Sequence, residues 1–247
     1  MKEFIDDELL IYRGKDYNLA PGITIRQPTL NEICDYGERA YWNMIYTLTS
    51  TGADLKFQLD DMGIDYTTIS DFTLFYSLLA PPYHSSKTNI ITGDLELSDF
   101  ELFQKNSSEE IVMYDSKRDI LIDEQIYQKF AEILRNMHGL KRNAQIPANE
   151  ATKQILIEDA REEYEHGKDK PYVSQLKNLV SAMVNCQGFK YNHSQVWDMK
   201  INAFLDSVKR ISKIKNAEML LQSGYSGFGI NLKEIPNSQL NWLGELD

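Results

Sequence analysis

Apolar and polar positions along the first fifty residues follow patterns that predict strands and then a helix. Two short apolar runs, Leu9–Gly14 and Ile23–Gln27, flank a turn-rich segment and are predicted to form a pair of antiparallel strands. Thr29 and Glu32 then supply the T-x-x-E pattern of a capping box, which places the start of a helix. Helical spacing of apolar residues continues to about Ser50, so one long helix is predicted there.

Further along, the same patterns predict short helices, a small sheet and one strongly amphipathic helix. The short helices are expected at Ala53–Met62 and Asp71–Leu79. The stretches "FELFQ" and "EIVMYD", separated by polar "KNSSE", predict a hairpin, and "DILID" predicts a third strand. In Asp123–His138 the apolar residues recur at helical spacing, with Asp123 as the natural N-cap and Gly139 as the natural end.

A polar, proline-containing stretch, Leu140–Glu150, is predicted to be the main linker of the chain. Beyond it the sequence predicts helices almost throughout, ending in a glycine-rich turn and a short tail. We therefore expect an α+β fold that is predominantly helical, with a small antiparallel sheet in the N-terminal half. The expected division is an α+β region over residues 1–140 and a helical region over residues 147–247.

The helix predicted before Ser50 carries apolar side chains on two opposite faces. One face is a continuous apolar stripe, whereas Trp42 and Tyr46 lie roughly opposite it, together with Asp35 and Arg39. A helix that is apolar all round is usually buried, so the second half of the chain is one candidate to cover this face. The other interpretation is a docking surface for another polypeptide, since Trp, Tyr and Arg are frequent anchors of interfaces. These four residues are the predicted partner-binding site.

Composition narrows the classes of function. The chain of 247 residues has a formal net charge of −11, which disfavours binding to nucleic-acid phosphates. No apolar run approaches the roughly 20 residues of a membrane span, and the acidic N-terminus does not look like a signal peptide. Cys34 and Cys186 are expected to be reduced and buried as small hydrophobic residues. These features are typical of a soluble intracellular protein.

No set of residues forms a recognisable catalytic or metal-binding pattern. Glu163 and His166 make a single Glu-x-x-His step, whereas di-iron bundles use two such steps with further glutamates. In "GYSGFG" the serine, Ser226, is followed directly by glycine and so departs from the G-x-S-x-G of a nucleophile elbow. His138 is expected at a helix C-terminus in a structural role. We therefore expect no enzyme activity and no cofactor or metal.

Several sequence blocks resemble proteins encoded in the tail-morphogenesis region of phages of Gram-positive bacteria, which are often grouped with tail assembly chaperones. The blocks cover most of the chain and are "IYRGKDY", "ITIRQPTLNEICDYGERAYW", "SAMVNCQGFKYNHSQVWDM", "INAFLDSVKRISKIKNAEMLLQSGYSG" and "NWLGELD". The resemblance implies a chaperone that covers the long, aggregation-prone helices of the tape measure protein while the tail tube polymerises. An acidic, mostly helical protein with apolar helix faces is compatible with that role.

The chain also departs from such chaperones, because many of them are shorter and lack a β-containing N-terminal half. A structural component of the phage tail or baseplate is therefore the alternative function. The expected location is the host cytoplasm for a chaperone and the virion for a structural component. The expected partner is a phage tail protein, with the tape measure protein the first candidate. Neither nucleic acid nor a membrane is expected as a partner, and self-association is left open.

Overall fold

A computed structural model describes residues 3–83, 85–105, 110–226 and 229–246. It confirms the α+β class, because 56% of the chain is helical and two small antiparallel sheets lie in the N-terminal half. The helices up to residue 138 are α1 (Glu3–Tyr12), α2 (Leu30–Tyr36), α3 (Glu38–Thr49), α4 (Lys56–Asp61), α5 (Asp71–Leu74), α6 (Ser85–Thr92) and α7 (Glu124–His138). The strands are β1 (Tyr17–Ala20), β2 (Ile23–Ile25), β3 (Glu101–Gln104), β4 (Ile111–Asp115) and β5 (Ile120–Ile122). The remaining helices are α8 (Glu150–Gly167), α9 (Gln175–Val184), α10 (Ile201–Tyr225) and α11 (Asn237–Leu240).

The first predicted strand is wrong, because its residues end a helix. Leu9–Tyr12 form the last turn of α1, and Ile11 points into the core. The strand that pairs with β2 is instead β1, and a turn at Gly22 joins the two. Gly22 has a φ of +78°, and a Cβ atom there would meet the side chain of Ile120 at 2.9 Å, so the site requires glycine. Short apolar runs fit either a helix or a strand, which is why the pattern misplaced this one.

The long helix predicted up to Ser50 is two helices, broken at Gly37. This residue has φ 98° and ψ 110°, a conformation outside the helical region, so α2 ends and α3 begins in a new direction. The capping box is present as predicted, with Thr29 Oγ1 accepting from the Glu32 N–H at 3.1 Å. Cys34, on α2, is exposed and Cys186 is half-buried, which corrects the expectation that both cysteines are buried.

The three-stranded sheet and α7 follow the sequence prediction closely. β3, β4 and β5 pair in that order, all antiparallel, while the turn between β3 and β4 lies outside the described residues. Asp123 caps α7 by accepting from the Ile126 N–H, and Gly139 ends it in the left-handed conformation. The predicted helix at 71–79 is present in a modified form, as α5 followed by a π-helical turn. Helix α6 was not predicted.

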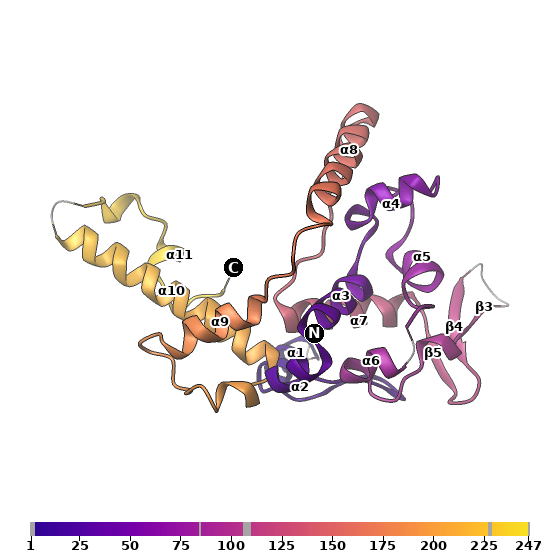
Figure 1. Ribbon diagram of the computed structural model, residues 1–247, viewed down its shortest axis with the longest axis horizontal. Helices are drawn as coiled ribbons and strands as arrows, with labels where there is room; N and C mark the ends of the chain where they lie inside the picture. The colour runs from indigo at the N-terminus through magenta and orange to yellow at the C-terminus, as the bar shows by residue number, and fades with distance from the viewer. Residues whose placement is uncertain (1–2, 84, 106–109, 227–228, 247) are drawn as a thin grey trace.

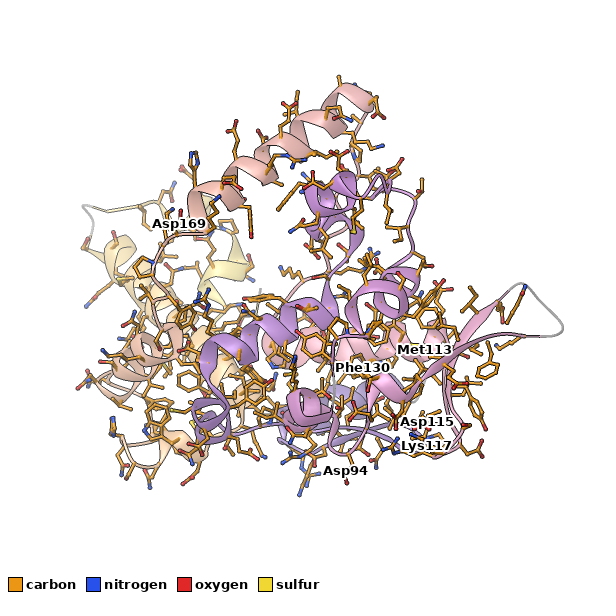
Figure 2. The ribbon with its side chains drawn as sticks, turned by 45° about the vertical axis from the view of Figure 1, so that its right-hand side comes forward. Asp94, Met113, Asp115, Lys117, Phe130 and Asp169 are labelled. Carbon is orange, nitrogen blue, oxygen red and sulfur yellow. The ribbon has the colours of Figure 1, made fainter. Side chains whose placement is uncertain are left out.

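The core lies among α2, α3, α7 and the start of α10, and the sheets border it (Figure 1). Met113 of β4 and Phe130 of α7 belong to this core (Figure 2). The largest fully buried side chains include Tyr41, Tyr127, Phe75, Phe204, Ile23, Ile25, Leu30, Ile33, Met44, Ile45, Leu48 and Leu59. Most of the apolar stripe predicted on α2 and α3 therefore faces the core, and the far end of the chain adds Phe204 to that core.

A short backbone bridge ties that far end into the N-terminal core. The Leu30 N–H donates to the Met199 carbonyl, and the Ile201 N–H donates to the Pro28 carbonyl, both at 3.0 Å. The bridge directs Ile201 and Phe204, the first apolar residues of α10, into the core, where both are fully buried. The C-terminal helices therefore do not pack only on one another.

Helix α8 projects from the body of the molecule beside α4 (Figure 1). Ile157 is its one buried residue, while Arg161 pairs with Asp61 at 2.7 Å and Tyr164 packs on Phe57. Irregular segments join α8 to α7 and to α9 at its two ends. Among the described residues, no helix has both the length and the apolar character needed to cross a bilayer.

We expect Phe204→Ala to lower the free energy of unfolding by about 3–4 kcal/mol, because it opens a cavity in a shared core. Chemical denaturation followed by circular dichroism should still show one cooperative transition. Met219→Ala, on an exposed position of the same helix, is the control and should change stability by less than about 0.5 kcal/mol. A separate early transition of the C-terminal helices in Phe204→Ala would contradict the shared core.

Candidate functional site

The outer face of α3 carries an exposed patch of aromatic and cationic side chains. Arg39, Trp42 and Tyr46 come from α3, and Tyr172 comes from the segment that leads into α9. Arg39 is exposed, Tyr46 and Tyr172 are 49% and 44% exposed, and Trp42 is half-buried. These four residues are called the α3 surface below. The structure thus brings three of the four predicted site residues together.

The fourth predicted residue, Asp35, lies apart from them on α2. It is exposed, and the break at Gly37 separates its helix from α3. Among the described residues, Asp35 forms no ion pair with Arg39. Asp35 and Arg39 share a face only if the helix is continuous, and the break at Gly37 removes that condition.

Trp42 and Tyr46 have different surroundings. The Trp42 ring packs on the buried Tyr41 and His138 rings, with both centroid separations at 5.6 Å. Its indole nitrogen is buried and has no hydrogen-bond partner among the described residues. Tyr46 stacks at an angle against the outer side of Trp42, 5.9 Å away, and faces solvent. Trp42 therefore forms the base of the surface, and Tyr46 forms its accessible edge.

The C-terminal half covers one end of this helix face through Glu38. The Glu38 carboxylate accepts from the Gln175 and Leu176 N–H groups at 2.9 and 2.8 Å, so it caps the first turn of α9. Burial opposes its ionisation, but these donors and the Ser174 and Tyr172 side chains hold the pKa of Glu38 below its ordinary value. An acid on α3 thus fixes where α9 begins.

The same anchoring places Tyr172 over Arg39. The guanidinium carbon of Arg39 lies 5.9 Å from the centre of the Tyr172 ring, within the range of a cation–π contact. Burial, together with its hydrogen bond to Glu38, raises the pKa of Tyr172 to about 12. Tyr172 was not singled out in the sequence. Its only signal there was an aromatic residue beside Pro171, just before the helix-capping Ser174.

His138 lies directly beneath the α3 surface and is buried. Its Nδ1 is 2.6 Å from the Leu134 carbonyl, so Nδ1 carries the proton and donates to it. The Tyr41 hydroxyl lies 2.5 Å from Nε2 and therefore donates to that nitrogen. Burial lowers the pKa of His138 to about 4, so the imidazole is neutral and is not the cation that a helix C-terminus would favour. This arrangement agrees with the structural role expected for it.

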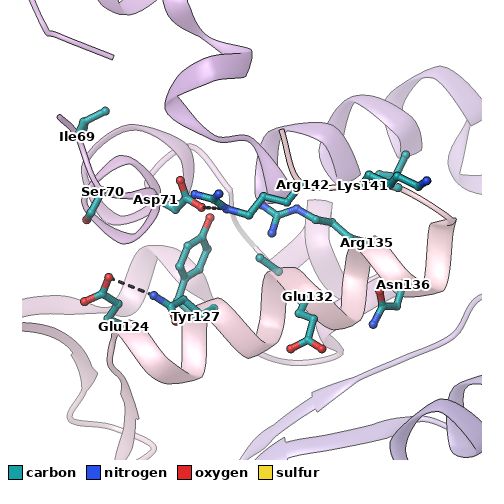
Figure 3. Close-up of a pocket in the computed structure, with 13 residues that line it drawn as sticks. Ile69, Ser70, Asp71, Glu124, Tyr127, Glu132, Arg135, Asn136, Lys141 and Arg142 are labelled. Atoms are coloured by element: carbon teal, nitrogen blue, oxygen red, sulfur yellow. Dashed lines mark hydrogen bonds and ion pairs between the residues drawn. The ribbon is translucent and has the colours of Figure 1, made fainter. Parts of the chain in front are cut away.

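A cleft of about 710 Å³ opens along another face of α7 (Figure 3). Arg142 binds Asp71 across it, with Nε 2.8 Å from the carboxylate, and Arg135 donates to the Thr49 carbonyl at 2.5 Å. Tyr127 points its hydroxyl toward the Asp71–Arg142 pair (Figure 3), and that hydroxyl has no hydrogen-bond partner within the described part of the chain. The cleft thus contains the Asp71–Arg142 ion pair, whose charges balance each other, and beside it the Tyr127 hydroxyl as a hydrogen-bond donor.

Tyr127 is a titratable residue of this cleft whose pKa is strongly shifted. Burial, with the nearby charge of Asp71, raises the pKa of Tyr127 far above its ordinary value, so its hydroxyl stays protonated. Neither histidine nor cysteine is among the described residues that line the cleft.

The residues with metal-ligating or nucleophilic side chains, Glu163, His166 and Ser226, lie outside both the α3 surface and the cleft. Glu163 and His166 are exposed on the projecting α8, while Ser226 ends α10 and donates its hydroxyl to the Ser223 carbonyl. No group of three or more His, Cys, Asp or Glu side chains that could hold a metal occurs within the described ranges.

The comparisons with known proteins concern the C-terminal third of the chain. Residues 167–247 match the family model of the YomV second domain, and YomV is a phage-encoded protein. The matched range begins at the last residue of α8 and contains Tyr172, the capped start of α9 and all of α10. No curated protein and no solved structure matches the chain. The part of the chain that is similar to this phage-encoded domain therefore includes one residue of the α3 surface, Tyr172.

We expect the free energy of unfolding to decrease as the pH is lowered, because His138 becomes protonated more readily in the unfolded chain. Its pKa is about 4 in the folded protein and near 6.5 in the unfolded chain, so the unfolded chain binds more protons between these values. The stabilisation is complete above about pH 6.5 and is lost as the pH falls toward 4, by about 3 kcal/mol in total.

Urea unfolding at several pH values measures this effect. The free energy of unfolding should decrease more steeply with falling pH in the native protein than in His138→Gln, which has no titratable group at this position. His193→Gln, at an exposed histidine, is the matched control and should keep the native slope. Parallel profiles for the native protein and His138→Gln would contradict the assignment of a buried neutral imidazole.

Proposed function

We propose that this chain is a non-catalytic, phage-encoded binding protein that docks a partner polypeptide on the α3 surface. The observation that carries the proposal is the exposed group of Arg39, Tyr46 and Tyr172 around the half-buried Trp42. Aromatic residues with an arginine, set on a rigid base, are the composition that dominates binding energy at protein interfaces. Packing of Trp42 on His138 supplies that rigid base.

The geometry favours docking over catalysis for a further reason. Ionisable side chains close to the surface are held in single protonation states: His138 is neutral because of burial, and the pKa of Tyr172 is raised to about 12. Such groups neither accept nor release protons near pH 7. They can hold a fixed shape against a partner, which a recognition surface requires.

The partner we propose is a phage tail protein, with the tape measure protein the first candidate, which makes this chain a tail assembly chaperone. The sequence resemblance described above suggests this identity, and the match to a phage-encoded domain supports a phage setting. A helix of the partner would lie across α3 and contact Tyr46 and Tyr172, as amphipathic helices do in apolar grooves. The net charge of −11 would keep such a complex soluble.

The second candidate is a structural component of the tail or baseplate. It is favoured by the outer β-hairpin, where Leu102 and Phe103 remain 51% and 45% exposed. A folding helper that shields helices has no evident use for an exposed apolar strand, whereas an assembled particle can bury it between subunits. The two candidates differ in whether the protein leaves with the finished virion.

We expect Arg39→Ala combined with Tyr46→Ala to weaken partner binding about tenfold or more while the melting temperature stays within about 2 °C. Both side chains are accessible, so their removal leaves no cavity. Isothermal calorimetry against a tape measure fragment measures the affinity. Tyr225→Ala, at a tyrosine that is 80% exposed on α10, is the control and should bind normally.

Trp42→Ala should behave differently from the surface pair. Its ring packs on Tyr41 and His138, so its loss should cost about 2–3 kcal/mol of stability as well as affinity. Unchanged affinity in the Arg39/Tyr46 double variant, with native stability, would remove the α3 surface as the docking site.

We expect the protein to be absent from purified virions and to co-purify with tape measure protein from infected cells. Quantitative mass spectrometry of both fractions provides the measurement, with a major tail-tube protein as the internal standard. A fixed copy number in the virion would instead select the structural role and reject the chaperone.

A further inference from the structure

The outer edge of the three-stranded sheet is an exposed strand. All four residues of β3 are exposed, and β3 ends the strand order, with β4 on its one paired side within the described ranges. Figure 1 shows β3 on the outer side of the sheet, away from the helices. Soluble proteins usually protect such an edge, because its backbone groups can pair with another strand.

The hydrogen bonds to β4 define which backbone groups point outward. The Lys105 N–H donates to the Glu110 carbonyl at 3.0 Å, so Lys105 faces β4. Backbone direction alternates along an antiparallel strand, and Phe103 and Glu101 therefore also face β4. Leu102 and Gln104, between them, direct their N–H and C=O groups to the open edge.

Several large apolar side chains next to this edge are exposed to solvent. Leu102 and Phe103 are about half exposed, and Ile111 of the neighbouring strand β4 is 39% exposed. The Phe103 ring meets Tyr114 of β4 edge-on, with centroids 5.9 Å apart, so an aromatic row leads toward the open edge. Apolar surface arranged beside unpaired backbone is the signature of strand addition.

The charges flanking the strand indicate what kind of strand fits. The sequence from Glu101 to Lys105, "ELFQK", begins with an acid and ends with a base, with Phe103 at its centre. When two such strands pair antiparallel about Phe103, Glu101 of each copy lies opposite Lys105 of the other. The pattern is therefore complementary to itself.

We propose that β3 pairs antiparallel with β3 of a second copy of this chain, with the twofold axis at Phe103. Leu102 of one copy then exchanges both backbone hydrogen bonds with Gln104 of the other copy, which uses the outward-facing groups of both strands. Phe103 lies opposite Phe103 of the second copy, and the aromatic row runs across the junction. The two three-stranded sheets become one continuous sheet.

Two requirements together select this register: outward-facing backbone groups must lie opposite each other, and opposite charges must pair. Registers centred on Leu102 or on Gln104 also match outward-facing groups, but neither places Glu101 opposite Lys105. Only the register centred on Phe103 forms both interchain ion pairs, at non-hydrogen-bonded positions where side chains lie closest. An unrelated extended peptide would lack this match, so a second copy is the better occupant.

The proposal does not depend on the α3 surface, which uses other residues on another element. The paired segment is short, so we expect a weak dimer with a dissociation constant on the order of 10–100 μM. Sedimentation equilibrium of the full chain, from about 10 μM to about 1 mM, measures it.

Charge reversal tests the register. Glu101→Lys and Lys105→Glu should each raise the dissociation constant about tenfold or more, because like charges then lie opposite each other twice per dimer. The combined variant should restore dimerisation to near the native value. Glu110→Gln is the matched control: it removes the intrachain Lys105–Glu110 ion pair, 2.9 Å long, and should leave the dimer intact.

Amide hydrogen exchange separates strand pairing from other forms of association. At about 1 mM, the Leu102 and Gln104 amides should exchange about tenfold more slowly than in a dilute sample. The Phe103 and Lys105 amides, which already bond to β4, should show no such dependence. A monomer at every concentration, a failure of the combined variant to restore association, or concentration-dependent protection elsewhere would each overturn the proposal.

Discussion

Two backbone hydrogen bonds between residues 28–30 and 199–201 determine how the two ends of the chain are assembled. They hold the start of α10 against the start of α2, and they direct Ile201 and Phe204 into a core otherwise built by the N-terminal half. Burial of those side chains supplies the free energy, while the hydrogen bonds define the register. The position of α9, and with it the candidate site, depends on this attachment.

The α3 surface is a product of that attachment. Glu38 caps α9 from 137 residues earlier in the sequence, and this contact brings Tyr172 over Arg39. One end of the helix face is therefore covered by the C-terminal half, whereas the end around Tyr46 stays open. Cover by the C-terminal half, the first interpretation of this two-faced helix, holds at the Glu38 end, whereas docking at the open end around Tyr46 stays a proposal.

Burial shapes the electrostatics around this surface and along α7. Removing groups from water lowers the pKa of His138 and raises the pKa of Tyr41 and Tyr127, so each stays neutral at neutral pH. Neutral, hydrogen-bonded groups give rigidity to the base of a docking surface but little capacity for proton transfer. The proposed role in polypeptide recognition follows from that rigidity together with the exposed rings above it.

Local signals in the sequence determined most of the individual elements. The Thr29–Glu32 capping box, the Asp123 cap with the Gly139 stop, and the three successive strand segments β3–β5 all depend on a few neighbouring residues, and all are present in the structure. They could be predicted because short-range hydrogen bonds and side-chain spacing are written directly in the order of residues. The apolar stripe that faces the core was likewise visible as a periodic pattern.

Tertiary structure decided the helix break at Gly37, the choice of β1 over Leu9–Gly14, and the meeting of Arg39 with Tyr172. Glycine inside a helical pattern is compatible with either continuation or a break, and a short apolar run suits either a helix or a strand. Only the packing partners, which lie far away in the sequence, select between such local alternatives. For the same reason the sequence indicated the α3 residues of this surface but not Tyr172, which comes from the segment before α9.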